Sequence, residues 1–142
     1  MYKNVLLAVD LGEDLSWQRA LPESLNLLSG QDGVLHIMTV VPDFGMTIVG
    51  SFFPADYEKK ALKEANERLH AFVADHVPKG IKVQHIVKHG SPAEEILETA
   101  KQVPTDLIVI GSHRPGMDHA LLGSVASKVV ARATCSVLIV RE

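Results

Sequence analysis

Residues 107–133 read LIVIGSHRPGMDHALLGSVASKVVARA. Leu107–Ile110 is a short apolar run typical of a buried strand, and Val125–Ala133 predicts a helix. The loop between them carries three glycines and ends in Gly123-Ser124, where Ser124 is expected to cap the helix. Strand, glycine-bearing loop and helix in this order are how α/β proteins bind phosphate, through free backbone N–H groups at the helix start. The stretch therefore predicts a nucleotide phosphate site, although the same glycines also suit a plain connection.

The rest of the chain alternates predicted strands and helices. The further strands are expected at Val5–Val9, Gly33–Val41, Ile81–Val87 and Val137–Val140, and the further helices at Leu15–Leu28, Ala55–His76 and from Pro92 onward. Near-continuous apolar strands separated by helices indicate a parallel sheet that is covered on both faces. We predict an α/β fold in one domain, residues 1–142: a doubly wound five-stranded parallel sheet, order 3-2-1-4-5, with two helices on each face.

Local signals refine three of the helices. Pro22 is expected to kink the first helix or mark its true start. Ser91-Pro92-Ala93-Glu94 reads as a capping box with proline at the first helical position. The predicted buried stripes are Ala93, Ile96, Leu97 and Ala100 in that helix, and Val125, Val129, Val130 and Ala133 in the last.

Three strand ends converge in this fold. Ligands of doubly wound sheets bind beyond the carboxyl ends of the strands, at the switch point. Asp10, Val40-Val41 and Gly111 all follow or end predicted strands there. We therefore expect a single site at that edge of the sheet.

Composition excludes several classes of function. The net charge is −3 and no Lys/Arg cluster occurs, which argues against a nucleic-acid partner. No apolar run approaches the roughly 18 residues of a membrane helix, and the first residues do not resemble a signal peptide. A single cysteine, Cys135, suits a reducing compartment. We expect a cytoplasmic protein with no membrane partner.

The loop does not fit other well-known phosphate sites. Met117 stands where a P-loop needs lysine, and Asp118 stands where it needs Ser or Thr. The first strand is followed by Leu11-Gly12-Glu13 rather than a GxGxxG fingerprint. A receiver domain would need an aspartate after the third strand, where this chain has Lys88-His89-Gly90.

Six segments along the whole chain resemble the universal stress protein family, and in particular its ATP-binding type. They are VLLAVD (5–10), TVVPD (39–43), HGSPAEEIL (89–97), DLIVIGSH (106–113), LLGSVASKVV (121–130) and CSVLIVRE (135–142). ATP-binding members carry Gly-x-x-Gly, nine residues, then Gly-Ser or Gly-Thr. Here Arg114 replaces the second glycine and the run is one residue short, with Gly116 the candidate to take its place. SHRP followed by LLGS resembles one bacterial subgroup.

The resemblance implies a pocket for ATP. Asp10 would accept hydrogen bonds from the ribose, with capping of its own turn as the alternative, and Ala8 and Val40 would border the base. The implied phosphate contacts come from Gly111, Ser112, Gly123, Ser124 and Val125, with His113 and Arg114 beside them. No catalytic residue and no protein metal site are predicted, and Mg²⁺ would accompany ATP on phosphate and water ligands.

Three function classes remain open at this point. The first is an ATP-binding regulatory protein, the second a slow ATP-hydrolysing enzyme, and the third an interaction protein of the same fold without nucleotide. The family also implies a homodimer through the strand Val137–Val140, whose exposed edge lacks charge.

Overall fold

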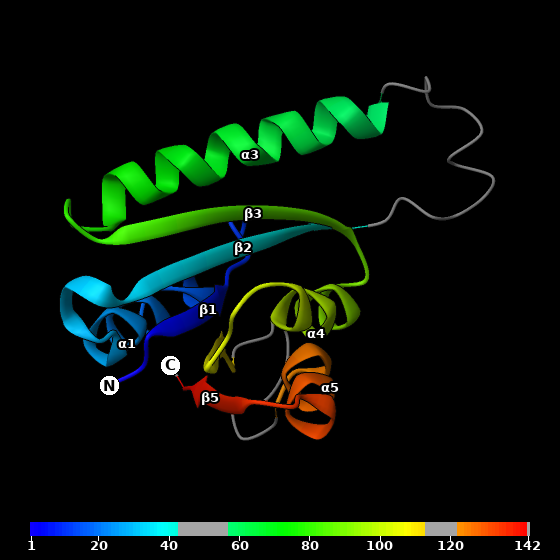
Figure 1. Ribbon diagram of the computed structural model, residues 1–142. Coiled ribbons are helices and arrows are strands. Elements are labelled where there is room, and N and C mark those ends of the chain that lie inside the picture. The colour runs from blue at the N-terminus through cyan, green and yellow to red at the C-terminus, as the bar shows by residue number, and fades with distance from the viewer. Residues whose placement is uncertain (43–56, 113–121, 142) are drawn as a thin grey trace.

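The computed structural model describes residues 1–42, 57–112 and 122–141. Its strands are β1 (Asn4–Ala8), β2 (Val34–Pro42), β3 (Lys82–Gly90), β4 (Leu107–Gly111) and β5 (Ser136–Val140). Its helices are α1 (Ala20–Leu27), α3 (Tyr57–His76), α4 (Pro92–Gln102) and α5 (Ser124–Arg132), with short 3-10 turns η1 (Asp14–Ser16) and η2 (Gly30–Asp32). The strands form one parallel sheet in the order β3-β2-β1-β4-β5, which confirms the predicted topology (Figure 1).

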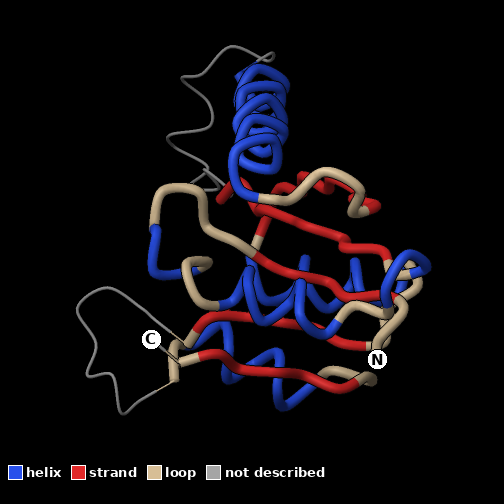
Figure 2. The backbone as a smooth tube through the Cα atoms, turned by 90° about the vertical axis from the view of Figure 1, so that its left-hand side faces the viewer, coloured by secondary structure: helices blue, strands red, loops and turns tan. Residues whose placement is uncertain are grey.

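The strands lie side by side in one sheet (Figure 2), which separates two hydrophobic layers. On one face Leu21 of α1 and Leu69 and Phe72 of α3 are buried against the strands. On the other face Ile96 of α4 and Val129 of α5 are buried in a second cluster. Two helices on each face are therefore confirmed. The central strands β1 and β4 are buried on both sides, because every face they present is covered by a helix.

The starts of three helices can be compared with the local signals in the sequence. α1 begins at Ala20, so Pro22 lies in its first turn, where a missing N–H costs no helical hydrogen bond. Ser91 is the N-cap of α4 and Pro92 its first residue, as expected, but the Ser91 side chain makes no capping hydrogen bond. The N-cap of α5 is Gly123, so Ser124 is the first helical residue and the predicted Ser124 cap is wrong.

The buried stripe of α5 also runs differently. Ala126 and Val129 are its buried residues, whereas the side chain of Val130 is 49% exposed. Positions three apart share a face of a helix, and Val130 lies about 100° round from Val129. The prediction that Val130 is buried was wrong, because apolar character alone does not say which of two adjacent valines faces the sheet.

The long helix α3 lies along the edge strand β3. The rings of His70 and His85 stack at 3.7 Å between centroids, nearly parallel at 6°. Burial, with His70 as a second cause, lowers the pKa of His85. At the far end of the same pair of elements His89 contacts Glu58 at 3.1 Å. These polar contacts add to the buried Leu69 and Phe72 in holding α3 over the edge strand.

Candidate functional site

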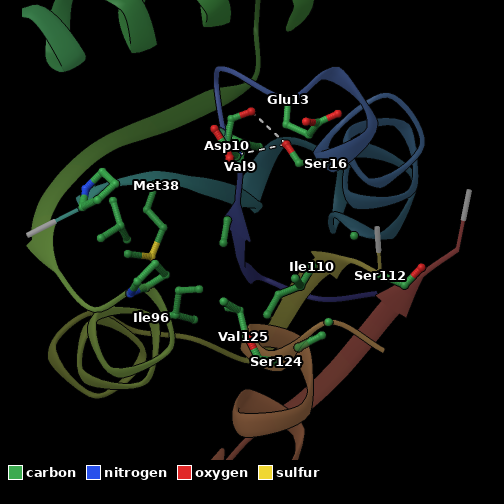
Figure 3. Close-up of a pocket in the computed structure, with 17 residues that line it drawn as sticks. Val9, Asp10, Glu13, Ser16, Met38, Ile96, Ile110, Ser112, Ser124 and Val125 are labelled. Atoms are coloured by element: carbon green, nitrogen blue, oxygen red, sulfur yellow. Dashed lines mark hydrogen bonds between the residues drawn. The ribbon is translucent and has the colours of Figure 1, made fainter. Parts of the chain in front are cut away.

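A cavity of about 350 Å³ lies at the carboxyl ends of β1, β2 and β4 (Figure 3). Eight of the residues predicted from the sequence line it: Ala8, Asp10, Val40, Gly111, Ser112, Gly123, Ser124 and Val125. The other three, His113, Arg114 and Gly116, lie outside the described residues. The structure therefore brings together every predicted site residue that it describes.

The position of the cavity follows from the strand order. The sheet grows outward from β1 in one direction and from β4 in the other, so consecutive crossovers leave the sheet on opposite faces. A crevice forms at that switch point because no connection closes it. The ends of β1 and β4 contribute Val9, Asp10, Ile110 and Gly111 to the lining.

The sequence analysis missed part of the lining: Val9, Glu13, Ser16, Met38, Pro42, Pro92, Ile96, Ile110 and Ala126. Met38 could have been found, because it shares a strand face with Val40 two residues later. Ile96 was predicted as a buried residue of its helix. It also lines the cavity, because the helix that carries it lies beside the switch point. No local signal points to Ser16.

Asp10 holds the turn that follows β1. Its Oδ1 atom accepts a hydrogen bond from the Gly12 N–H at 3.0 Å, and its carbonyl accepts one from the Glu13 N–H, also at 3.0 Å. This is the turn-capping role that the sequence left open as an alternative. The side chain nevertheless lines the cavity and the residue is exposed, so turn capping does not remove the carboxylate from the site.

The lack of a side chain at Gly111 also has a structural reason that the sequence did not predict. A Cβ atom on Gly111 would lie 2.9 Å from the carbonyl oxygen of Ser16, closer than real Cβ contacts allow. The absence of a side chain thus makes room for the chain's own η1 turn. Gly111 also lines the cavity, so a side chain at this position would affect both the η1 turn and the cavity.

The start of α5 forms the wall opposite Asp10, Glu13 and Ser16 (Figure 3). Gly123 has an extended backbone (φ −63°, ψ 159°) and the helix has no side-chain cap. The Ser127 N–H donates to the Gly123 carbonyl at 3.0 Å, so the three preceding N–H groups have no helical acceptor. The first turn carries no acidic residue. This wall therefore presents the positive end of a helix to the cavity.

The remaining lining divides into an apolar and an acidic part. Met38, Ile96 and Ile110 are buried and form apolar surface between the two walls. Asp10 and Glu13 are the charged residues of the described lining, which contains no Lys, Arg or His. Such a site suits a ligand with a flat apolar part, hydroxyl groups and a distant anionic end.

The residues that the structure describes hold neither a cluster of metal ligands nor a helix that could span a membrane. No group of three or more His, Cys, Asp or Glu side chains there lies close enough to hold a metal ion. Within the same residues, no helix combines the length and the apolar composition that crossing a membrane requires.

Known proteins resemble this chain over its whole length. The sequence model of the universal stress protein family matches residues 1–141. Universal stress protein G of Escherichia coli O157:H7 is 33% identical over 144 residues, which cover 99% of this chain and 100% of the relative. The solved structure of protein MJ0577 has a TM-score of 0.81 and 26% identity, covering 100% of this chain and 97% of that one.

A universal stress protein solved in complex with cAMP is also similar, with a TM-score of 0.60 and 27% identity, over 99% of this chain and 97% of that one. The resemblance seen in the sequence is thus confirmed at the level of the family. Because the family model matches all residues but the last, and a relative is 33% identical over its full length, this chain belongs to the universal stress protein family.

Proposed function

We propose that this protein binds an adenine nucleotide, with ATP as its ligand, and acts as a regulatory module rather than as an enzyme. One observation carries the proposal: eight residues chosen from the sequence, on four separate elements and their flanks, line one cavity. Most of them bring apolar side chains or glycine backbone to the cavity, which suits a base and a phosphate chain.

The charges within the cavity orient the ligand. Phosphate would be repelled by Asp10 and Glu13 and attracted by the start of α5 on the opposite wall. We therefore assign the phosphates to the backbone of Gly123, Ser124 and Val125. The ribose then lies toward Asp10 and the base lies along Val40 and Met38.

Two further facts support binding over turnover. The described lining holds no Lys, Arg or His, the groups with which phosphoryl-transfer sites hold and stabilise the transferred phosphate. The similar universal stress protein solved with cAMP carries an adenine nucleotide. Mg²⁺ would enter with ATP on phosphate and water ligands.

Isothermal titration with ATP, ADP and AMP tests the proposal. Gly123→Val adds a branched side chain to the wall assigned to the phosphates, so ATP affinity is expected to fall at least about a hundredfold. Ser127→Val is the matched control, because Ser127 is exposed on the same helix and does not line the cavity. Equal ATP affinity in wild type and Gly123→Val would rule the site out. Chromatography of the nucleotide after hours of incubation separates binding from slow hydrolysis.

We also propose a homodimer through β5. This strand is an edge of the sheet, and Val137–Val140 carries no charge that would discourage pairing. The Val140 carbonyl accepts a hydrogen bond from the Ser112 N–H at 2.9 Å, so the peptide groups of Val140 face β4. Since peptide groups alternate along a strand, those of Ile139 face outward, where a second copy would pair.

That alternation provides a selective test. Ile139→Pro removes one outward N–H and leaves the β4–β5 hydrogen bonds in place, as proline permits at a sheet edge. We expect the variant to elute as a monomer in size-exclusion chromatography, while Ile139→Ala, which keeps the N–H, elutes as wild type. A dimer that survives Ile139→Pro would exclude this interface.

A further inference from the structure

The backbone of Asp10 lacks its expected strand neighbour. The Val9 N–H donates to the Met38 carbonyl of β2 at 2.9 Å, so the peptide groups of Asp10 point to the opposite side, where β4 lies. The ladder between β1 and β4 nevertheless ends at Ala8 and Ile110. In a regular parallel ladder the Asp10 N–H would donate to the Gly111 carbonyl, whereas the peptide groups of Ser112, the residue level with Asp10, face β5. The two strands therefore part at the cavity.

The hydroxyl of Ser16 takes the place of β4. Its Oγ atom accepts a hydrogen bond from the Asp10 N–H at 2.9 Å and donates one to the Asp10 carbonyl at 3.0 Å (Figure 3). One side chain thus bonds to both backbone groups of Asp10, and the Glu13 N–H shares the carbonyl. The carbonyl of the same residue fills the space left free by Gly111. Ser16 is therefore wedged between the ends of β1 and β4.

We infer that Ser16 is a positioning residue of the nucleotide site, which keeps β1 and β4 apart and sets the Asp10 carboxylate in the cavity. The single proton of its hydroxyl is used on the Asp10 carbonyl, so Ser16 does not donate to a ligand. It acts through Asp10. The inference rests on the proposed function, because it assigns to Asp10 a contact with the bound nucleotide.

A double-mutant cycle read by ATP titration tests this action through Asp10. Ser16→Ala is expected to weaken ATP binding about five- to tenfold in the wild-type background. In the Asp10→Ala background the same change is expected to cost less than about twofold, because the carboxylate that it positions is gone. Ser16→Thr retains the hydroxyl and is expected to restore most of the affinity.

Ser24→Ala is the matched control. The Ser24 hydroxyl also donates to a backbone carbonyl, that of Ala20 at 2.8 Å, but it is buried in α1 and does not line the cavity. Its loss is expected to lower the unfolding temperature without changing ATP affinity. Hydrogen exchange adds a readout that needs no ligand: the Asp10 amide is expected to exchange faster in Ser16→Ala than in Ser24→Ala.

The outcomes separate the two claims. If wild type binds no adenine nucleotide, the proposed function fails and the inference falls with it. If wild type binds ATP but Ser16→Ala costs nothing, or costs the same with and without the Asp10 carboxylate, only the inference is overturned. Should Ser16→Ala not fold, Ser16→Cys replaces the hydroxyl by a weaker donor of similar shape and is read in the same cycle.

Discussion

Two helices begin beside the same cavity, and their first turns differ in charge. α4 starts with Pro92, and Glu94 and Glu95 lie in its first turn. α5 starts with Ser124 after a glycine N-cap, and its first turn carries no acid. Neither N-cap residue makes a side-chain capping hydrogen bond. The positive end of α4 is thus balanced by its own carboxylates, whereas the first turn of α5 carries no such charge.

The starts of α4 and α5 thus lie at the same cavity but contribute different chemical groups to it. Proline has no N–H to offer a ligand, so α4 contributes Pro92 and Ile96 to the cavity as apolar surface. α5 contributes its first residues, Ser124 to Ala126, on the other side, where we propose that backbone N–H groups bind phosphate. We therefore expect changes in α4 to act through packing and changes in α5 to act through charge.

The largest effect is expected from the apolar wall. Ile96 is 3% exposed, so Ile96→Ala leaves a cavity in the core and should lower the free energy of unfolding by about 2–5 kcal/mol. Urea unfolding measures it. The loss of ATP affinity should be matched by an equal loss for adenosine, since the wall contacts no phosphate in the proposed arrangement. A loss for ATP alone would contradict the division of tasks.

The next largest effect is expected when the first turn of α5 receives a carboxylate, as the first turn of α4 already has. Ser124→Glu places a carboxylate in the wall assigned to phosphate, and ATP affinity is expected to fall about ten- to hundredfold. The loss should decrease from ATP to AMP and vanish for adenosine. Ser124→Gln, of equal size without the charge, is the control. An acid at the start of a helix stabilises it, so the unfolding temperature should not fall.

A smaller effect is expected from the converse change. Glu94→Gln removes a carboxylate from the first turn of α4, and Glu94 is exposed and does not line the cavity. Stability should fall by about 0.3–1 kcal/mol, and ATP affinity should stay unchanged. A clear gain in ATP affinity would mean that phosphate lies near α4 rather than α5.

The smallest effect is expected from a change of pH. Neither first turn contains a histidine, so His85, the histidine whose pKa is shifted, lies away from both helix starts. The pKa of His85 lies below 6.5 in the folded protein, mainly because of burial. The unfolded chain therefore binds more protons below about pH 6.5, and stability falls as the pH falls through that value. His85→Phe keeps a ring beside His70 and should lose less stability than wild type between about pH 7 and pH 5. Unfolding curves at both values that shift equally for the two proteins would contradict this.

Much of the architecture could be predicted without the structure. Short apolar runs such as Leu107–Ile110 have the signature of strands buried on both faces, and the alternation with helical patterns leaves few topologies. The predicted site residues Asp10, Val40 and Gly111 were found for the same reason, because each lies at or next to the carboxyl end of a strand. Errors arose where neighbouring residues share the same chemistry. Gly123 and Ser124 are both good N-caps, and Val129 and Val130 are both apolar.

The amino-acid sequence alone determined the periodicities, the strand order and the edge of the sheet that carries the site, because these depend on patterns local to each element and on the handedness of crossovers. Only the tertiary structure decided that Ser16 bonds to Asp10 and that Gly111 makes room for Ser16. It also decided that α4 faces the cavity with the apolar residues Pro92 and Ile96 and α5 with a first turn that carries no acid. These contacts join segments that are far apart in the sequence. The spacing of residues along the chain therefore does not predict that the η1 turn lies between the ends of β1 and β4.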